Sequence, residues 1–193
     1  MDKFCHYINS IDKNNISKSN GSIFFINHSQ KTYLLTAAHT LRKFNEPIYP
    51  DFNNWQAKHL ELLNKDRIPL YNNDLPLFSY FPLNDKELLD AVMIPVTGCS
   101  SGQVDYSGGE IGENIKLCGW RRSPDITKFI YDGKIIDKDG WHLLISLNSI
   151  VERNGISGGG VYTDKGFIGV YYADDIDKKF SHAVSINYML LGD

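Results

Sequence analysis

Three short stretches of the chain carry side chains that could act together on a carbonyl group. They are LLTAAHT with His39, LLDAVMI with Asp90, and NGISGGG with Ser157. A serine hydroxyl is a weak nucleophile alone, because it is not ionised near neutral pH. A neutral imidazole can take its proton and return it, and a carboxylate can hold the imidazole in the required tautomer. The three residue types therefore indicate hydrolysis of an acyl bond such as an amide.

The glycines around Ser157 would serve the same chemistry. Amide hydrolysis forms an oxyanion, which needs hydrogen-bond donors already aimed at it. The N–H groups of Gly155 and Ser157 can converge on one point only if the chain turns sharply between them, and glycine permits such a turn. Gly158 and Gly159 would let the following strand pack closely behind the serine.

Each stretch alone has an ordinary structural interpretation. A single GxSGG is a turn in most proteins, His39 could be a core histidine, and Asp90 could cap a turn. The combination favours catalysis, and the chain order His, Asp, Ser matches one known arrangement of these residues. Cys118 could be a nucleophile only near His39, and its apolar surroundings in IKLCGW favour a buried position. An acidic cluster is predicted to be a solvated loop and not a metal site; it comprises Asp174, Asp175 and Asp177.

Composition narrows the class of protein. The 193 residues are 42% hydrophobic and 22% charged, as in an ordinary globular protein. A net charge of −3 argues against nucleic-acid binding, and no apolar run has the length of a signal peptide or membrane helix. The scattered cysteines Cys5, Cys99 and Cys118 give no disulfide framework, and the histidines show no zinc-binding spacing. We expect a cytoplasmic protein without cofactor or metal, and without nucleic-acid or membrane contacts.

Most of the chain is predicted as short strands. Ser22–Ile26 and Thr32–Leu35 flank NHSQK and predict a hairpin, and TAAHTLRKF predicts one helical turn after it. Leu88–Val96 predicts a strand containing Asp90. Helical periodicity is limited to Asn54–Leu63 and the last residues. Six more strands are predicted at Ile115–Gly119, Lys128–Ile136, Trp141–Ser146, Gly160–Tyr162, Phe167–Tyr172 and Ser181–Ile186.

Turn-rich segments divide these strands into two halves. Residues 98–114 contain five glycines and predict a linker. Residues 45–86 contain five prolines and predict long loops. We expect an N-terminal arm at 1–19 and β-rich halves at 20–97 and 115–193.

Together the motifs resemble those of the trypsin/chymotrypsin-like serine proteases, closest to the bacterial trypsin-like and HtrA-like peptidase domains. The resemblance rests on LLTAAHT, LLDAVMIPV, IGENIKLCGW, NGISGGGVY, GFIGVYY and HAVSI. It implies an all-β fold of two perpendicular six-stranded barrels with the active site in the cleft between them. It also implies a serine endopeptidase acting on a peptide or protein. Ser157 would attack, His39 would be the general base, Asp90 would orient His39, and Gly155 and Ser157 would form the oxyanion hole.

The resemblance further implies a primary-specificity pocket near Ala183, lined by Val151, Glu152, Tyr171 and Tyr172. Val151 at its base would favour an apolar or small substrate residue. Glu152 would favour Arg or Lys if its carboxylate faced inward, and a solvent-facing Glu152 is an equal alternative.

Departures from the family pattern concern control and compartment. Ile156 stands where secreted members carry an aspartate that pairs with a newly cut N-terminus, so we expect control by a regulatory partner or a loop rearrangement instead of zymogen cleavage. Thr40 and Arg153 replace half-cystines, as expected inside a cell. Gly160 replaces a small residue or proline, which we expect to be tolerated. The alternative function is a protease-like binding or scaffold module without turnover.

Overall fold

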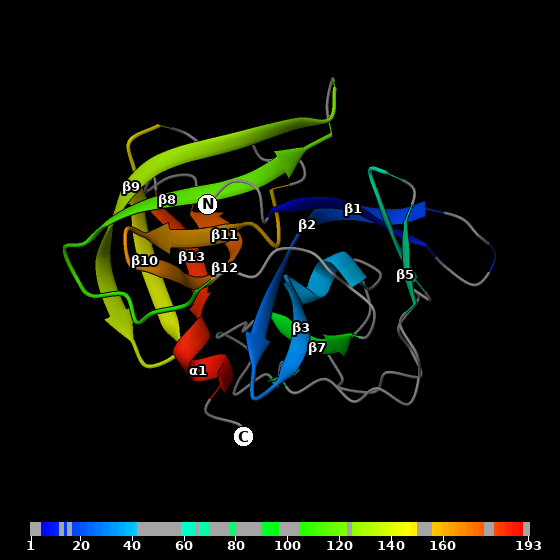
Figure 1. Ribbon diagram of the computed structural model, residues 1–193. Coiled ribbons are helices and arrows are strands. Elements are labelled where there is room, and N and C mark those ends of the chain that lie inside the picture. Colours follow the sequence, from blue (N-terminus) through cyan, green and yellow to red (C-terminus); the bar gives the residue numbers. More distant parts are fainter. Residues whose placement is uncertain are drawn as a thin grey trace.

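The computed structural model describes residues 5–11, 14, 17–41, 59–64, 66–69, 78–79, 90–96, 105–122, 125–149, 156–175 and 180–190. These residues form two antiparallel β units that pack side by side (Figure 1). The strands of the first half form one unit and those of the second half form the other. The expectation of a fold built almost entirely from strands is confirmed.

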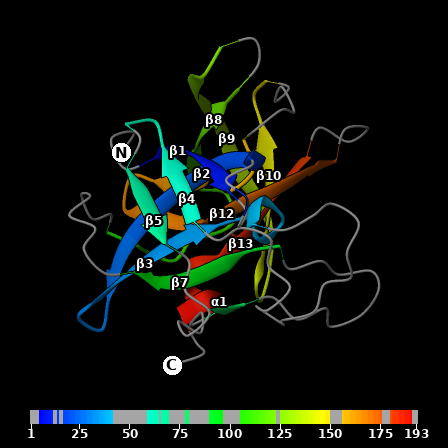
Figure 2. The ribbon, with the colours of Figure 1, turned by 90° about the vertical axis from the view of Figure 1, so that its right-hand side faces the viewer.

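The first unit is a seven-stranded sheet in the order β5-β4-β1-β2-β3-β7-β6, seen in front of the barrel in Figure 2. Its strands are β1 (His6–Ile11), β2 (Ser17–His28), β3 (Lys31–Thr36), β4 (His59–Leu62), β5 (Arg67–Pro69), β6 (Phe78–Ser79) and β7 (Val92–Val96). Within the described residues the sheet is open, with β5 and β6 at its edges. The closed six-stranded first barrel that we expected is therefore not seen in this part of the chain.

The second unit is a closed barrel in the order β10-β13-β12-β11-β8-β9. Its strands are β8 (Asn114–Arg121), β9 (Thr127–Asp139), β10 (His142–Leu147), β11 (Gly160–Thr163), β12 (Gly166–Asp175) and β13 (Phe180–Ser185). Two short helices complete the described structure, the 3-10 helix η2 (Ala38–Leu41) after β3 and α1 (Ile186–Leu190) after β13. The helical turn predicted around His39 and the helix predicted near the C-terminus are thus confirmed.

The apolar run IFFI of β2 is buried on both of its faces. Because side chains alternate along a strand, Ile23 and Phe25 pack with Leu34 in the core of the first sheet. Phe24 and Ile26 point the other way, into the core shared by the two units. Burial of both faces over these four residues explains the unbroken apolar run.

The predicted hairpin turns at Ser29 and Gln30, whose φ angles are 48° and 63°. Two consecutive residues with positive φ define the turn type whose twist suits a two-residue hairpin. The helix expected over Asn54–Leu63 is wrong where the chain is described: His59–Leu62 is strand β4, between β1 and β5. Leu60 is buried in the core of the first sheet and the neighbouring Glu61 is partly exposed, as expected where successive side chains of a strand point to opposite faces.

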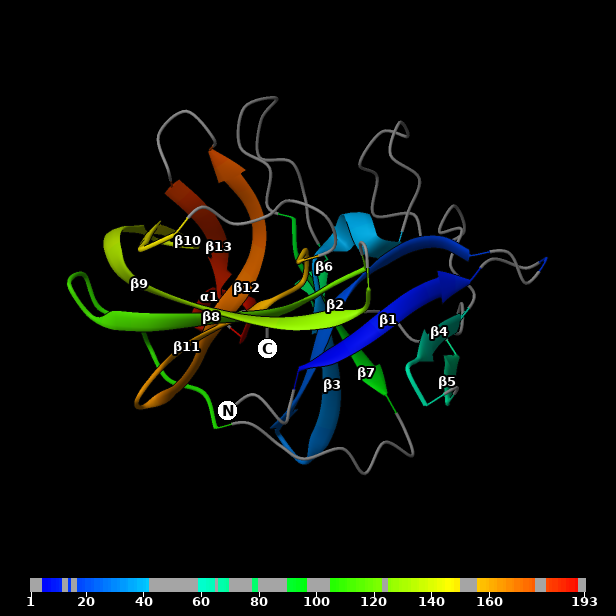
Figure 3. The ribbon, with the colours of Figure 1, turned by 90° about the horizontal axis from the view of Figure 1, so that it is seen from above.

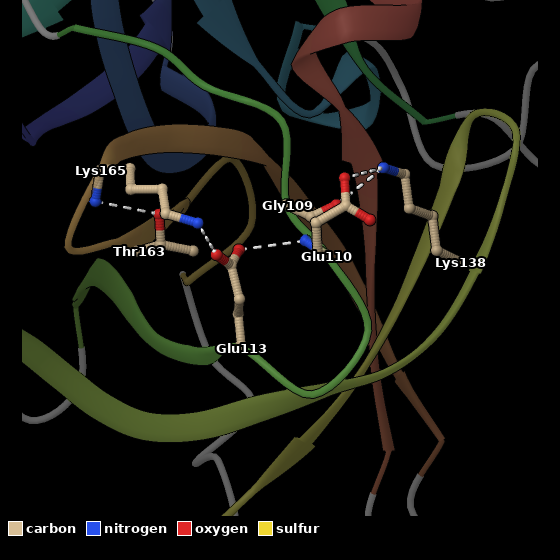
Figure 4. A network of polar contacts seen from close by, with 6 residues as sticks. All are labelled: Gly109, Glu110, Glu113, Lys138, Thr163 and Lys165. Carbon is tan, nitrogen blue, oxygen red and sulfur yellow. Dashed lines mark hydrogen bonds and ion pairs between the residues drawn. The ribbon is translucent and has the colours of Figure 1, made fainter.

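The end of the expected linker is held on the barrel by charged side chains (Figure 4). Lys138 Nζ donates to the carbonyl of Gly109 at 2.7 Å and lies 3.5 Å from Glu110 Oε1. Lys165 pairs with Glu113, and this hydrogen bond lowers the pKa of the Glu113 carboxyl. Residues 105–113 therefore lie against the barrel before β8 begins. Within the expected N-terminal arm, residues 6–11 form β1, which pairs with both β2 and β4.

Candidate active site

His39 and Asp90 form a close pair in the first sheet, where β3 ends and β7 begins. Asp90 Oδ2 contacts His39 Nδ1, and Asp90 Oδ1 accepts the His39 backbone N–H at 2.8 Å. An ionised carboxylate only accepts hydrogen bonds, so Nδ1 carries a proton and the lone pair of a neutral ring lies on Nε2. The two side chains are 23% and 17% exposed, so the pair is accessible from solvent without being fully hydrated.

Strand register brings these two distant residues together. β3 pairs with β7 so that Thr36, the last residue of β3, lies opposite Val92. β3 is followed by η2, which carries His39, and Asp90 lies two residues before β7. The Ala38 N–H donates to the Asp90 carbonyl at 3.4 Å. The strand predicted at Leu88–Val96 starts at Val92 in the described residues, which leaves Asp90 just before it and free to face η2.

Ser157 lies on a tight turn anchored by its neighbours. Ile156 is 1% exposed and belongs to the barrel core. Gly159 N–H donates to the Ile156 carbonyl at 2.8 Å, and Gly158 N–H donates to the Tyr171 carbonyl at 3.0 Å. Gly158 has φ of +80°, which strongly favours glycine. The sequence-based reason for glycine after the serine is therefore supported at Gly158.

The turn that carries Ser157 packs closely against the end of β3, which leads to His39. A Cβ added at Gly158 would overlap Ser22 O and Thr36 Oγ1, and it would lie 3.1 Å from Ala37 N. A Cβ added at Gly21 would lie 2.8 Å from Ser157 O. Gly160 is covered by the ring of Phe24, whose atoms would lie 2.6–2.8 Å from an added Cβ. Close backbone approach thus places Ser157 beside the segment that carries His39.

The hydroxyl of Ser157 and the ring of His39, both described, are not joined by a hydrogen bond in this structure. Catalytic hydrogen bonds are often long or poorly aligned in a free enzyme and shorten when substrate binds. The arrangement can supply a nucleophile, a base and an orienting carboxylate once the serine side chain turns toward Nε2. Gly155, the second expected oxyanion donor, lies outside the described residues.

Two of the four residues expected to line a specificity pocket are described, and their side chains pack in different clusters. The side chain of Tyr171 is 5% exposed and packs in the barrel core with Ala183. Tyr172 is partly buried against the shared core, with its ring centroid 6.1 Å from that of His182. Val151 and Glu152 lie outside the described residues, as does Arg153. Of the two tyrosines, only Tyr172 offers side-chain surface to a ligand.

β12 extends past its pairing with β11 beside the serine turn. The pairing of β12 with β11 ends at Val170 and Gly160, whereas its pairing with β13 continues to Asp175 and Phe180. The Tyr171 carbonyl accepts the Gly158 N–H at 3.0 Å, so β12 passes directly beside the turn that carries Ser157. An extended peptide can bind to a strand through backbone hydrogen bonds.

Sequence reasoning missed the buried hydroxyls behind the pair. Thr36 Oγ1 donates to the Ser22 carbonyl at 2.8 Å and lies 3.0 Å from Thr40 Oγ1. Thr40 Oγ1 also lies 2.7 Å from the Ala37 carbonyl oxygen. Serine and threonine inside strands carry no distinctive pattern, so only their spatial contacts identify them.

Other chemistry has little support. Cys118 is 3% exposed in the shared core, and the Cys5 thiol donates to its carbonyl at 3.7 Å, so the prediction of a buried residue is confirmed. Burial is the main cause that raises the pKa of Cys5. The described part of the chain contains no cluster of three or more metal-ligating side chains. None of its helices has the length and apolarity needed to cross a bilayer.

Comparison with known proteins shows the fold. No protein-family model and no curated protein sequence matches the chain. The active form of the Rv3671c protease of M. tuberculosis matches with a TM-score of 0.66, 13% identity, and coverage of 99% of this chain and 79% of that one. A serine endoprotease of Yersinia pestis matches at 0.65 and 14%, over 98% and 61% of the two chains. A Glu endopeptidase matches at 0.64 and 14%, over 98% and 88%. The chain therefore has a serine-protease-like fold.

Proposed function

We propose that the protein is a serine endopeptidase. Ser157 attacks the carbonyl carbon of a peptide bond and forms an acyl-enzyme, while His39 Nε2 takes the hydroxyl proton and passes it to the leaving amine. Water then releases the acyl group by the same route in reverse. Asp90 holds the His39 tautomer, and the N–H groups of Gly155 and Ser157 bind the oxyanion. The observation that carries this proposal is the two-point contact of Asp90 with His39, beside a serine turn packed on the same segment.

The substrate is an extended peptide or protein segment. It binds along β12, next to the turn that carries Ser157. Tyr172 contacts its side chains, together with Val151 and Glu152. The first domain covers 20–97 and forms the seven-stranded sheet together with β1 and the start of β2 from the N-terminal arm, the barrel domain covers 115–193, and 98–114 connects them.

Control of the site operates through the serine turn. Ile156 occupies the barrel core, where an apolar contact anchors the turn without an ion pair to a cut N-terminus. A regulatory partner or loop movement brings Ser157 Oγ to His39, which are not hydrogen bonded here. The same observation supports the alternative, a protease-like module that holds a partner without turnover.

A fluorophosphonate probe separates these two functions. We expect the wild-type protein to be labelled and the Ser157→Ala variant not to be, because the probe needs an activated serine. Ser29→Ala, which changes an exposed serine of the β2–β3 turn, is the control and keeps full labelling. Equal labelling of wild type and Ser157→Ala would exclude Ser157 as the nucleophile. No labelling of wild type, alone or in lysate of its native host, would favour the binding module.

A further inference from the structure

Ser22 lies in β2 where three segments of the fold meet. Its N–H donates to the carbonyl of Ser157 at 2.8 Å. Its carbonyl accepts the hydroxyl of Thr36 at 2.8 Å. Its own Oγ accepts the backbone N–H of Trp120 at 2.8 Å. With no solvent exposure, Ser22 joins the serine turn, the end of β3 and strand β8 in the interior of the molecule.

The hydrogen bond with Trp120 also connects Ser22 to the Ser157 turn through strand β8. Figure 3 shows β8 passing close to β2, where Trp120 and Ser22 are hydrogen bonded. The preceding residue, Gly119, lies so near Ile156 that an added Cβ would be 2.7 Å from Ile156 Cγ2. β8 therefore packs against Ile156, the residue that precedes Ser157. Any movement of β8 away from β2 would change the support of the serine turn.

We propose that Ser22 is a positioning residue, whose hydroxyl fixes the serine turn relative to His39. This role rests on the proposed peptidase function. The N–H and carbonyl contacts of Ser22 come from the backbone and persist with alanine at this position. Two contacts depend on the side chain, because Oγ accepts the Trp120 N–H and is hydrogen bonded to the Cys5 thiol. Loss of Oγ leaves the Trp120 N–H without that acceptor, and relief of this cost shifts β8 and the turn that it supports.

The test compares Ser22→Ala with a matched variant elsewhere. Thr163 is also a buried hydroxyl that accepts a backbone N–H, that of Lys165 at 3.2 Å, in the β11–β12 turn of Figure 4. Thr163→Val therefore removes the same kind of bond away from the site. Labelling by a fluorophosphonate is followed over a range of probe concentrations, and thermal unfolding is recorded for each variant.

We expect Ser22→Ala to lower the labelling rate at saturating probe by about 10-fold or more, since small displacements of reacting groups cost rate steeply. The half-saturating probe concentration should stay the same, because the binding surface is unchanged. Thr163→Val should label at the wild-type rate, and Ser22→Thr, which keeps the acceptor, should restore most of the rate. If Ser22→Ala does not fold, Ser22→Cys leaves no cavity, weakens the acceptor, and carries the same expectation.

Wild-type labelling of a folded Ser22→Ala or Ser22→Cys protein would overturn the positioning role. An equal loss of rate in Thr163→Val would also overturn it if Thr163→Val and Ser22→Ala had the same melting temperature. The loss would then follow the stability of the protein and not the position of the hydroxyl. Failure of the proposed function gives a different result: the wild-type protein itself would not be labelled.

Discussion

At the scale of single residues, the site depends on which nitrogen of His39 carries the proton. Asp90 makes two contacts with His39, one to the ring and one to the backbone. The backbone contact fixes the carboxylate, and the ring contact then selects the tautomer. One acidic side chain therefore sets both the position and the tautomer of His39.

We predict that Asp90→Asn lowers the labelling or hydrolysis rate by a factor on the order of 10³–10⁴. If the side-chain oxygen of the asparagine accepts the His39 backbone N–H as Asp90 does, the side-chain NH₂ faces Nδ1. This NH₂ donates to Nδ1 and so stabilises the tautomer with the proton on Nε2. That tautomer cannot accept the proton of Ser157. The rate is measured beside Asp132→Asn, which alters an exposed acid paired with Lys116 and should leave it unchanged. A rate within threefold of wild type would refute the role of Asp90.

At the scale of elements, the serine turn and the end of β3 approach so closely that only glycine fits. Gly158 combines a positive φ with contact to Ser22 and Thr36. Gly112 also has a positive φ, +90°, but a Cβ added there would meet nothing within 4 Å. Substitutions at these two glycines therefore distinguish the free-energy cost of a positive φ from the additional cost of steric overlap.

Gly112→Ala should lower the free energy of unfolding by about 1–2 kcal/mol, the cost of a left-handed conformation for alanine. Gly158→Ala should lower it by several kcal/mol more and abolish labelling, because the added methyl forces the turn away from β2. Urea unfolding of both variants measures the difference. Equal destabilisation by the two substitutions would contradict the close packing of the turn.

At the scale of the whole molecule, partly buried histidines link stability to pH. Burial, and then the charge of Lys128, lowers the pKa of His6 below its usual 6.5. Burial and the neighbouring His182 lower that of His142, partly opposed by Asp137 and Asp139. The unfolded chain therefore binds protons at a higher pH than the folded chain does.

Because the pKa values of His6 and His142 are lowered in the folded chain, we predict that their protonation does not reduce the free energy of unfolding above about pH 6.5. The free energy of unfolding then falls as the pH drops toward about 5. Urea midpoints at pH 7.5 and 5.5 test it, with the double variant His6→Gln, His142→Gln as comparison. The decrease should be smaller in the double variant, which cannot gain these protons. An identical decrease in both proteins would assign the effect to other groups.

The sequence by itself determined most strands and named the candidate site residues. Apolar alternation and turn residues act over a few positions, so the predicted strands of the barrel and the β2–β3 hairpin are found in the structure. His39 and Ser157 were candidates from the sequence alone, since the motifs around them depend on neighbouring residues. The Asn54–Leu63 prediction failed because a four-residue strand is stabilised by its partners β1 and β5 and leaves little periodicity of its own.

Tertiary structure alone decided which distant groups meet. The register of β3 with β7 places Asp90 against His39, across 51 positions of the chain. Packing of β2 against β8 and the serine turn gives Ser22 its three partners, although it is an ordinary strand residue by type. Residue type and spacing record local preference, whereas a hydrogen bond between remote segments depends on the free energy of the whole packed chain.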